Sequence, residues 1–217
     1  MITSNVSLNL CVLASGKGSN LNSIISAQKS HKINSKVALV ISNNSGSDAL
    51  NTARANQIPA VHLSQKLFKT EKEFETAFLK LFKEYKIDLI ILAGYMKLLS
   101  PEIIEKYRNR ILNIHPALLP SFSGHGMYGL KVHEEVLKHG AKITGATVHF
   151  VDEVYDNGPV ILQEQVKVSD NDTPETLQEK VLKLEHKLYP EAIKLFETGK
   201  INIKMIHTPG LSKGNDI

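Results

Sequence analysis

Short, nearly continuous apolar runs alternate with helical patterns in the first half of the chain. The apolar runs span residues 8–14, 36–41, 58–63, 88–94 and 110–115. Runs with so few polar positions are typical of strands buried on both faces, as in a parallel sheet. Between them, apolar residues recur at helical spacing over residues 20–27, 48–57, 71–86 and 101–107. This alternation predicts βαβ units with right-handed crossovers.

The second half has a different pattern. Residues 144–151 and 159–168 are strand-like, and the short connection between them predicts an antiparallel pair. A long amphipathic helix is expected over residues 174–197, followed by a last strand at 201–206. We therefore expect an α/β fold: a Rossmann-like open sheet, mostly parallel in the N-terminal half, with antiparallel strands and a long helix in the C-terminal half. Residues 1–206 are predicted to form a single domain, and residues 207–217 a loosely held tail.

Composition narrows the class of protein. The 217 residues are 42% hydrophobic and 22% charged, a balance that allows a real core. No apolar run approaches the roughly 20 residues that span a bilayer, and the polar start lacks the pattern of an export signal. The one cysteine, Cys11, cannot form an internal disulfide and lies in an apolar run, so a buried structural thiol is expected. These features favour a cytoplasmic protein without a membrane partner.

The charge pattern indicates the kind of ligand. The net charge is +4, but the lysines are spread along the chain and there is no Trp. Because no basic tract is interleaved with aromatic residues, we expect no nucleic-acid partner. Anionic small molecules remain compatible with this weakly basic surface.

The segment from Ser15 to Asn20 is the first candidate site, since it follows the first predicted strand and opens the first predicted helix. Its glycines allow close approach of a ligand, and free N–H groups at a helix N-terminus favour an anion. It has neither the dinucleotide fingerprint nor the Walker spacing. The segment therefore predicts a phosphate site. The alternative is a tight turn in which Ser19 or Asn20 only caps the helix.

The second candidate is Asn113 with His115, at the end of the fifth predicted strand. Residues two apart on a strand share a face, and Pro116 keeps His115 extended. Open α/β sheets bind ligands at this end of their strands. An amide donor beside an imidazole suits a carbonyl oxygen that gains negative charge during attack. A histidine that is merely hydrogen-bonded at a strand end is the other interpretation.

The acidic connection 152–158 is the third candidate. An aspartate beside a histidine stabilises the charged imidazole and can accept a proton. A solvated turn explains the same residues equally simply.

Four motifs occur in a specific order. They are Gly-x-Gly-Ser-Asn at 16–20, Leu-Ala-Gly-Tyr-Met-Lys-Leu-Leu at 92–99, Asn-Ile-His-Pro-Ala-Leu-Leu-Pro at 113–120, and Gly-Ala-Thr-Val-His-Phe-Val with Asp-Asn-Gly-Pro-Val-Ile within 145–161. With these motifs the chain resembles the glycinamide ribonucleotide formyltransferase family over about residues 8–206. The resemblance implies that a formyl group passes from 10-formyltetrahydrofolate, the co-substrate, to the amine of glycinamide ribonucleotide in de novo purine biosynthesis. The products would be formylglycinamide ribonucleotide and tetrahydrofolate.

The resemblance also implies a role for individual residues. The catalytic residues would be Asn113, His115 and Asp156, and no metal is implied. The substrate phosphate would be held by Gly18, Ser19 and Asn20, and the ribose hydroxyls by Glu185, which the residue pattern alone would present as a surface acid. The folate pocket would be lined by Met96, Lys97, Leu98, Leu99 and Asn113. His149 would lie near the site, although a buried core histidine is an equal alternative.

The chain departs from the family in two places. An arginine that contacts folate in many members is replaced by Glu71, and this contact stays unassigned between Lys69 and Lys72. The loop 123–129 is longer than in many members, and its glycines suit a flap over the folate. The resemblance also makes Leu119–Pro120 a candidate for a cis peptide bond, and His125 either a substrate contact or a loop residue.

Related folate enzymes give competing predictions. Methionyl-tRNA formyltransferases add a C-terminal tRNA-binding domain, and formyltetrahydrofolate deformylases usually add an N-terminal regulatory domain; we expect neither here. The phosphate segment favours a phosphorylated acceptor over water. A binding protein without catalysis would be expected to lack part of the Asn-His-Asp set. The expected partners are the two small-molecule substrates, with a monomer or a homodimer as the assembly.

Overall fold

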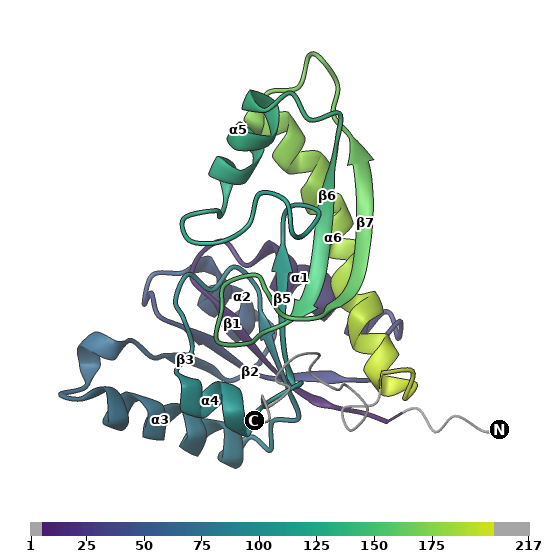
Figure 1. Ribbon diagram of the computed structural model, residues 1–217. Helices are drawn as coiled ribbons and strands as arrows, with labels where there is room; N and C mark the ends of the chain where they lie inside the picture. Colours follow the sequence, from purple (N-terminus) through teal and green to yellow (C-terminus); the bar gives the residue numbers. More distant parts are fainter. Residues whose placement is uncertain (1–5, 202–217) are drawn as a thin grey trace, which may run out of the picture.

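The computed structural model describes residues 6–201, which build one seven-stranded sheet (Figure 1). The strands are β1 (Asn9–Ala14), β2 (Lys36–Ser42), β3 (Ala60–His62), β4 (Leu89–Leu92), β5 (Ile111–His115), β6 (Ile143–Phe150) and β7 (Val160–Lys167). Their order is β3-β2-β1-β4-β5-β6-β7. Strands β1 to β5 are parallel, whereas β6 and β7 are antiparallel to their neighbours. The predicted fold class is confirmed.

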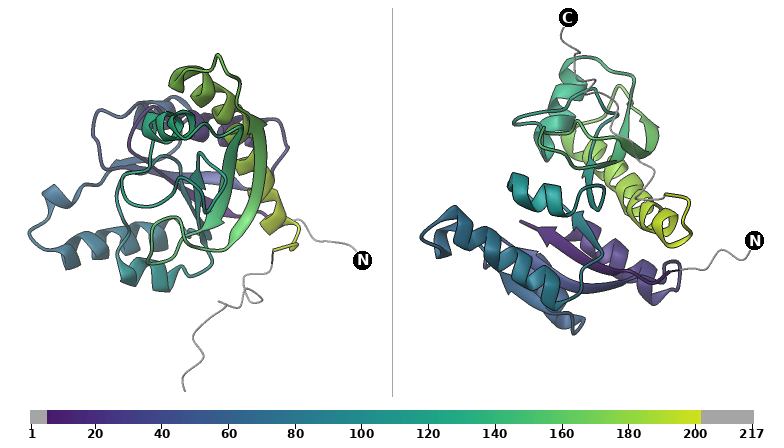
Figure 2. Two further views of the ribbon diagram at one scale, coloured as in Figure 1. Left: turned by 45° about the horizontal axis from the view of Figure 1, so that its top comes forward. Right: turned by 60° about the horizontal axis from the view of Figure 1, so that its bottom comes forward.

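Helices cover both faces of the sheet (Figure 2). They are α1 (Ser19–Lys29), α2 (Asp48–Ala55), α3 (Glu71–Glu84), α4 (Pro101–Lys106), α5 (Leu130–Lys138) and α6 (Pro174–Glu197), with a 3-10 turn η1 at Gln65–Leu67. Helices α1, α2 and α6 pack into one buried cluster, through residues such as Leu21, Leu50 and Ile193. Helices α3 and α4 pack into the other, through Phe78, Phe82 and Ile103.

The apolar runs of the sequence locate the strands because most of the sheet is buried on both sides. All four residues of β4 are buried, and so are five of the six in β1. The ends of the predicted strands and helices differ from the observed ends by at most two residues. Helix α5 was missed: it is short, follows a glycine-rich loop, and buries only Val132, His133 and Val136.

Several smaller expectations have separate outcomes. The predicted last strand lies outside the described residues apart from Ile201, and the predicted tail lies outside them entirely. The cis peptide bond at Leu119–Pro120 is confirmed. No helix within residues 6–201 is long and apolar enough to cross a membrane.

Strand β5 is the boundary between the two halves of the sheet. It pairs with β4 in parallel and with β6 in antiparallel fashion. The antiparallel register sets Asn113 opposite His149 and His115 opposite Thr147. Polar residues from two adjacent strands are thus brought together at the carboxyl end of β5.

Candidate active site

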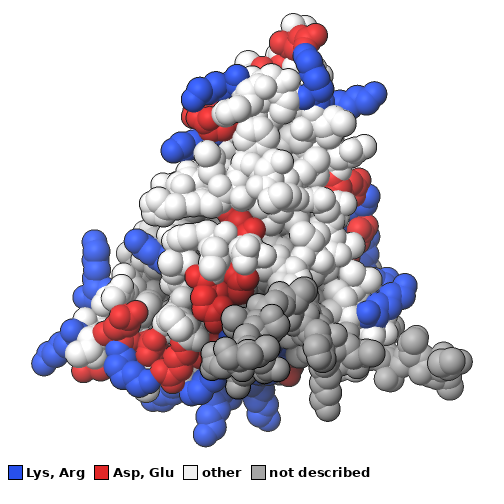
Figure 3. Space-filling model, in the orientation of Figure 1, with Lys and Arg blue, Asp and Glu red and all other residues white. Residues whose placement is uncertain are grey.

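A cavity of about 650 Å³ opens at the carboxyl ends of β4 and β5. Its walls come from the loop after β4, the end of β5, the loop 124–129, the loop before β7, and the helices α1, α5 and α6. The residues on these walls that the sequence singled out are Asn20, Met96, Lys97, Leu98, Asn113, His115, His125, Asp156 and Glu185. Few Lys or Arg side chains lie on the middle of the face in Figure 3, whereas many project from its lower edge.

Asn113 and His115 extend from the same face of β5, as predicted from their spacing. Ile114, between them, packs into the core with α1 and α6. His115 is only 3% exposed. The strand thus presents an amide donor and an imidazole side by side on the floor of the cavity.

Asp156 stands between the polar side chains of the site. Its Oδ2 accepts a hydrogen bond from the backbone N–H of Gly124 at 3.1 Å and lies 3.4 Å from His115 Nδ1. Its Oδ1 is 3.4 Å from Asn113 Nδ2. Asp156, from a distant loop, is therefore in contact with both predicted catalytic residues of β5, Asn113 and His115.

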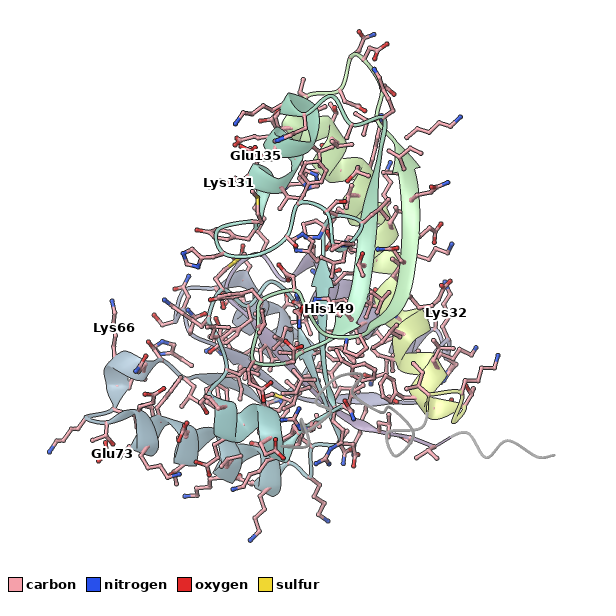
Figure 4. The ribbon with its side chains drawn as sticks, in the orientation of Figure 1. Lys32, Lys66, Glu73, Lys131, Glu135 and His149 are labelled. Carbon is pink, nitrogen blue, oxygen red and sulfur yellow. The ribbon has the colours of Figure 1, made fainter. Side chains whose placement is uncertain are left out.

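His149 of β6 completes this cluster and is 2% exposed (Figure 4). Its Nδ1 lies 2.7 Å from the Phe150 carbonyl oxygen, and its Nε2 lies 3.0 Å from Asn113 Nδ2. Because a carbonyl oxygen can only accept, Nδ1 carries the proton and Nε2 accepts from the Asn113 amide. His149 thereby fixes the orientation of that amide. Both interpretations of His149 apply, since it is buried and also part of the site.

Two opposing effects act on the pKa of His115, and the expected effect of Asp156 is the smaller one. We expected Asp156 to raise the pKa of His115. Burial instead lowers the pKa of His115 below its usual value, and Asp156 and the Phe122 carbonyl only partly offset this effect. The pKa of Asp156 is lowered: burial would raise it, but the proximity of His149 and His115 and the hydrogen bond from the Gly124 N–H outweigh that effect. Asp156 is therefore ionised at neutral pH.

The loop 121–129 contributes backbone groups to the cluster. The Phe122 carbonyl oxygen lies 2.7 Å from His115 Nε2, which therefore donates to it. Phe122 has a positive φ of 53°, as do three glycines of the segment at larger angles. With the Gly124 N–H on Asp156, this loop hydrogen-bonds to both catalytic candidates. His125 and Tyr155 both line the cavity, and the centroids of their rings are 6.0 Å apart.

The predicted phosphate segment begins α1. Gly18 is the residue before the helix, with a left-handed φ of 73°, and no side chain caps the helix start. Neither Ser19 nor Asn20 caps the helix, so that part of the alternative is wrong, whereas the tight turn itself is present and its phosphate stays a prediction. A Cβ on Gly18 would lie 3.0 Å from Ala49, so α2 packs directly on this turn. Asn20 is part of the cavity wall, whereas Gly18 and Ser19 do not line the cavity.

Asn20 and Glu185 meet although 165 positions separate them. Asn20 Nδ2 donates to Glu185 Oε2 at 2.7 Å, while Asn20 Oδ1 is buried without a partner. The Glu185 carboxyl is enclosed, although the residue as a whole is partly exposed. Burial raises the pKa of Glu185 to about 7, against the opposing effect of Asn20. Glu185, which the residue pattern alone presents as a solvated surface acid, thus lines the cavity.

The segment after β4 lines the cavity only in part. Met96 and Leu98 are 48% and 53% exposed, and with Lys97 they border the cavity. Leu99 does not, because its side chain is buried in the core with α3 and α4. The backbone of the segment is fixed by Ser15, whose Oγ accepts from Met96 N–H at 2.9 Å.

Two cavity residues, His133 and Gln178, lie outside every segment that the sequence singled out. Neither belongs to a motif, and each is placed by packing of α5 on α6. Lys69 and Lys72 do not line the cavity, and Lys72 pairs with Glu102 instead. Within residues 6–201 no group of three or more His, Cys, Asp or Glu could hold a metal ion.

Comparison with known proteins identifies the family of the chain. The family model described as formyl transferase matches residues 8–193. Phosphoribosylglycinamide formyltransferase of Bacillus subtilis is 36% identical over 183 residues, which are 84% of this chain and 91% of that protein. The chain belongs to the formyl transferase family.

Other relatives of this formyl transferase agree. Glycinamide ribonucleotide transformylase 1 of Symbiobacterium toebii has the same fold, with a TM-score of 0.84, 38% identity, and coverage of 92% of this chain and 94% of that one. The chloroplastic phosphoribosylglycinamide formyltransferase of Arabidopsis thaliana is 42% identical over 85% of this chain. The chain spans 63% of that plant protein and 19% of the human trifunctional purine biosynthetic protein adenosine-3, to which it is 40% identical over 89% of its own length.

Proposed function

We propose that this formyl transferase moves the formyl group of 10-formyltetrahydrofolate to the amine of glycinamide ribonucleotide. One observation carries the proposal: Asn113, His115 and Asp156 meet on the floor of a cavity whose wall includes the start of α1. The family and the names of the bacterial and plant relatives support the same reaction. The products are formylglycinamide ribonucleotide and tetrahydrofolate. The cytoplasmic location and the monomer or homodimer stay predictions.

The acceptor lies along the wall made by α1 and α6. Its phosphate binds the backbone N–H groups at Gly18, Ser19 and Asn20, because the helix start is free of side-chain caps. Its ribose hydroxyls donate to the Glu185 carboxylate beside Asn20. These two anchors hold the amine toward Asn113 and His115, and such positioning lowers the barrier by several kcal/mol.

The folate occupies the more apolar part of the cavity. Met96 and Leu98 on one side and Tyr155 on the other give a partly exposed apolar border. The backbone polar groups of residues 94–98 supply hydrogen bonds to a pterin ring. Leu99 stabilises this segment from the core rather than contacting the folate.

The formyl oxygen binds where the hydrogen bonds of the site are weakest. Asn113 Nδ2 is bonded well to His149 but lies 3.4 Å from Asp156, which is long for a hydrogen bond. The formyl oxygen takes this second N–H as the amine attacks. His115 donates a second hydrogen bond from Nε2, which exchanges the Phe122 carbonyl oxygen for the formyl oxygen. The charge that builds on the formyl oxygen favours the protonated imidazole against the effect of burial.

Proton transfer completes the reaction. The amine attacks the formyl carbon as a free base, and a C–N bond forms while the carbonyl becomes an alkoxide. Asp156, ionised and held by Gly124, guides the amine proton through water toward folate N10. The carbonyl then reforms, the bond from carbon to N10 breaks, and N10 leaves with the proton. No covalent enzyme intermediate is required.

A spectrophotometric assay of folate deformylation with and without glycinamide ribonucleotide tests the proposal. We expect turnover only with the amine, and its formyl derivative as the product. Equal folate turnover without the amine would replace the transferase by a hydrolase. Folate binding without turnover in either mixture would indicate a binding protein.

A further inference from the structure

His133 is a cavity residue that neither the motifs nor the reaction above use. It lies on α5, is 1% exposed, and lines the cavity together with His115 and Glu185. Helix α5 packs against α6, while its Lys131 and Glu135 lie on the outer side of the molecule (Figure 4). The ring of His133 is therefore held between helix packing on one side and the cavity on the other.

The ring has an unmet need for a polar partner. Nδ1 is shielded from solvent and has no hydrogen-bond partner in the described part of the chain. Leaving a buried polar group unpaired is unfavourable, and an apolar side chain of similar size would avoid that loss. A core histidine without a ligand is thus a poor choice at this position. His186 on α6 also has an unpartnered buried nitrogen, but it does not line the cavity.

The ring is uncharged at neutral pH. Burial, and to a smaller extent His115, lower the pKa of His133 to about 4. Besides His115, the titratable groups on the cavity wall are Asp156, Glu185, Lys97, His125, Tyr95, Tyr128 and Tyr155. A neutral imidazole offers one N–H and one lone pair.

The attacking amine has two N–H bonds, and the proton path through Asp156 accounts for only one of them. The attacking amine must turn its lone pair to the formyl carbon, so its N–H bonds point away from that carbon. Asn113 Nδ2 and His115 act as donors to the formyl oxygen, and these nitrogens cannot receive the second hydrogen. Asp156 already has the Gly124 N–H and contacts with both donors.

We propose that His133 binds the amine substrate, with a nitrogen of its ring accepting a hydrogen bond from the amine that attacks. This inference rests on the proposed function, because it assigns a contact to that same acceptor. It makes His133 an acceptor-binding residue with no contact to the folate. A neutral ring suits the role, since it holds an N–H without repelling an amine or keeping its proton.

The test compares three variants with the full-length wild-type protein. His133→Phe keeps the bulk of the ring and removes both nitrogens. His133→Gln keeps a hydrogen-bond acceptor. His186→Phe is the matched control, because it removes another buried, unpartnered nitrogen outside the cavity. Each is assayed for the Michaelis constants of both substrates, and the binding of glycinamide ribonucleotide alone is measured by calorimetry.

We expect His133→Phe to lower kcat/KM for the amine by about tenfold or more. The folate constant should change less than twofold, the melting temperature should not fall, and His133→Gln should recover part of the loss. His186→Phe should retain both constants. Equal effects on the two substrates, or no effect, would overturn the assignment.

Nitrogen NMR of the wild-type imidazoles separates this proposal from the proposed function. Addition of glycinamide ribonucleotide without folate should shift the ring signals that are missing in His133→Phe. Unshifted signals in a protein that still formylates the amine would overturn the role of His133 alone. A wild-type protein that neither binds nor formylates the amine would overturn the proposed function itself.

Discussion

Replacing Glu185 by Gln should make the protein more stable at alkaline pH while weakening the acceptor site. The Glu185 carboxyl is enclosed against Asn20, and its pKa is raised from 4.5 to about 7. The folded state therefore holds this proton more tightly than the unfolded chain does. The stabilising effect of the proton is complete below pH 4.5 and is lost as the pH rises through 7.

The size of the effect follows from the two pKa values. A difference of about 2.5 units corresponds to about 3 kcal/mol, since each unit is worth roughly 1.4 kcal/mol. Gln has the same length and can accept from Asn20, but it has no charge to bury. The variant should thus match the wild type near pH 5 and exceed it by up to about 3 kcal/mol at pH 8.

Urea unfolding of both proteins at pH 5, 6, 7 and 8 measures this difference directly. Glu191→Gln, on the exposed side of the same helix, controls for helix propensity and net charge. A difference that stays constant across the pH range, or a variant that is less stable at pH 8, would refute the reasoning. The Michaelis constant for the amine should rise in Glu185→Gln, because the carboxylate that is proposed to bind the ribose hydroxyls is removed. Residues that favour function at a binding site are often unfavourable for stability.

Three further predictions concern the other residues of the site. Asn113→Ala should lower kcat by roughly 100-fold with little change in either Michaelis constant, since it removes a donor to the oxyanion; an unchanged rate in steady-state kinetics would exclude that role. Asp156→Asn should lower kcat about 100-fold and lower the pKa of His115 further, because the carboxylate raises that pKa; an NMR titration in which the pKa does not fall would contradict the pairing. Gly18→Ala should destabilise the protein by about 1–3 kcal/mol in urea, because φ is 73° and the new Cβ would lie 3.0 Å from Ala49; an unchanged midpoint would show that the turn adapts.

The sheet could be predicted from sequence because its strands are buried on both faces. An entirely apolar run such as Leu89–Leu92 is favourable in a chain of this size only where the sheet covers it on both faces. Helix α5 could not be found in the same way. Its buried positions Val132 and Val136 give a single helical repeat, and the glycines before it favour a loop. Tertiary packing on α6 decides its structure.

The candidate site was predictable only where its residues share a strand or a motif. Asn113 and His115 follow from strand alternation, whereas Asp156 came from the family resemblance. His149 could have been found from pairing of β5 with β6, which sets it opposite Asn113. The contact of Asn20 with Glu185 depends on helices brought together by the whole fold, and no local pattern encodes it. Leu99 was misplaced because a motif shows which residues recur, not which side of the backbone they face.

The backbone at Asp156 limits which residues can evolve there. Its φ is 53°, in the left-handed region, where Asp and Asn are tolerated far better than other non-glycine residues. A glutamate would carry the same charge but would strain the turn and displace its carboxylate. A substitution to alanine would strain the backbone in the same way and would also remove the charge. Mutational paths from this position therefore lead first to asparagine or glycine, which keep the loop intact while removing the carboxylate, so the fold can outlast the loss of catalysis.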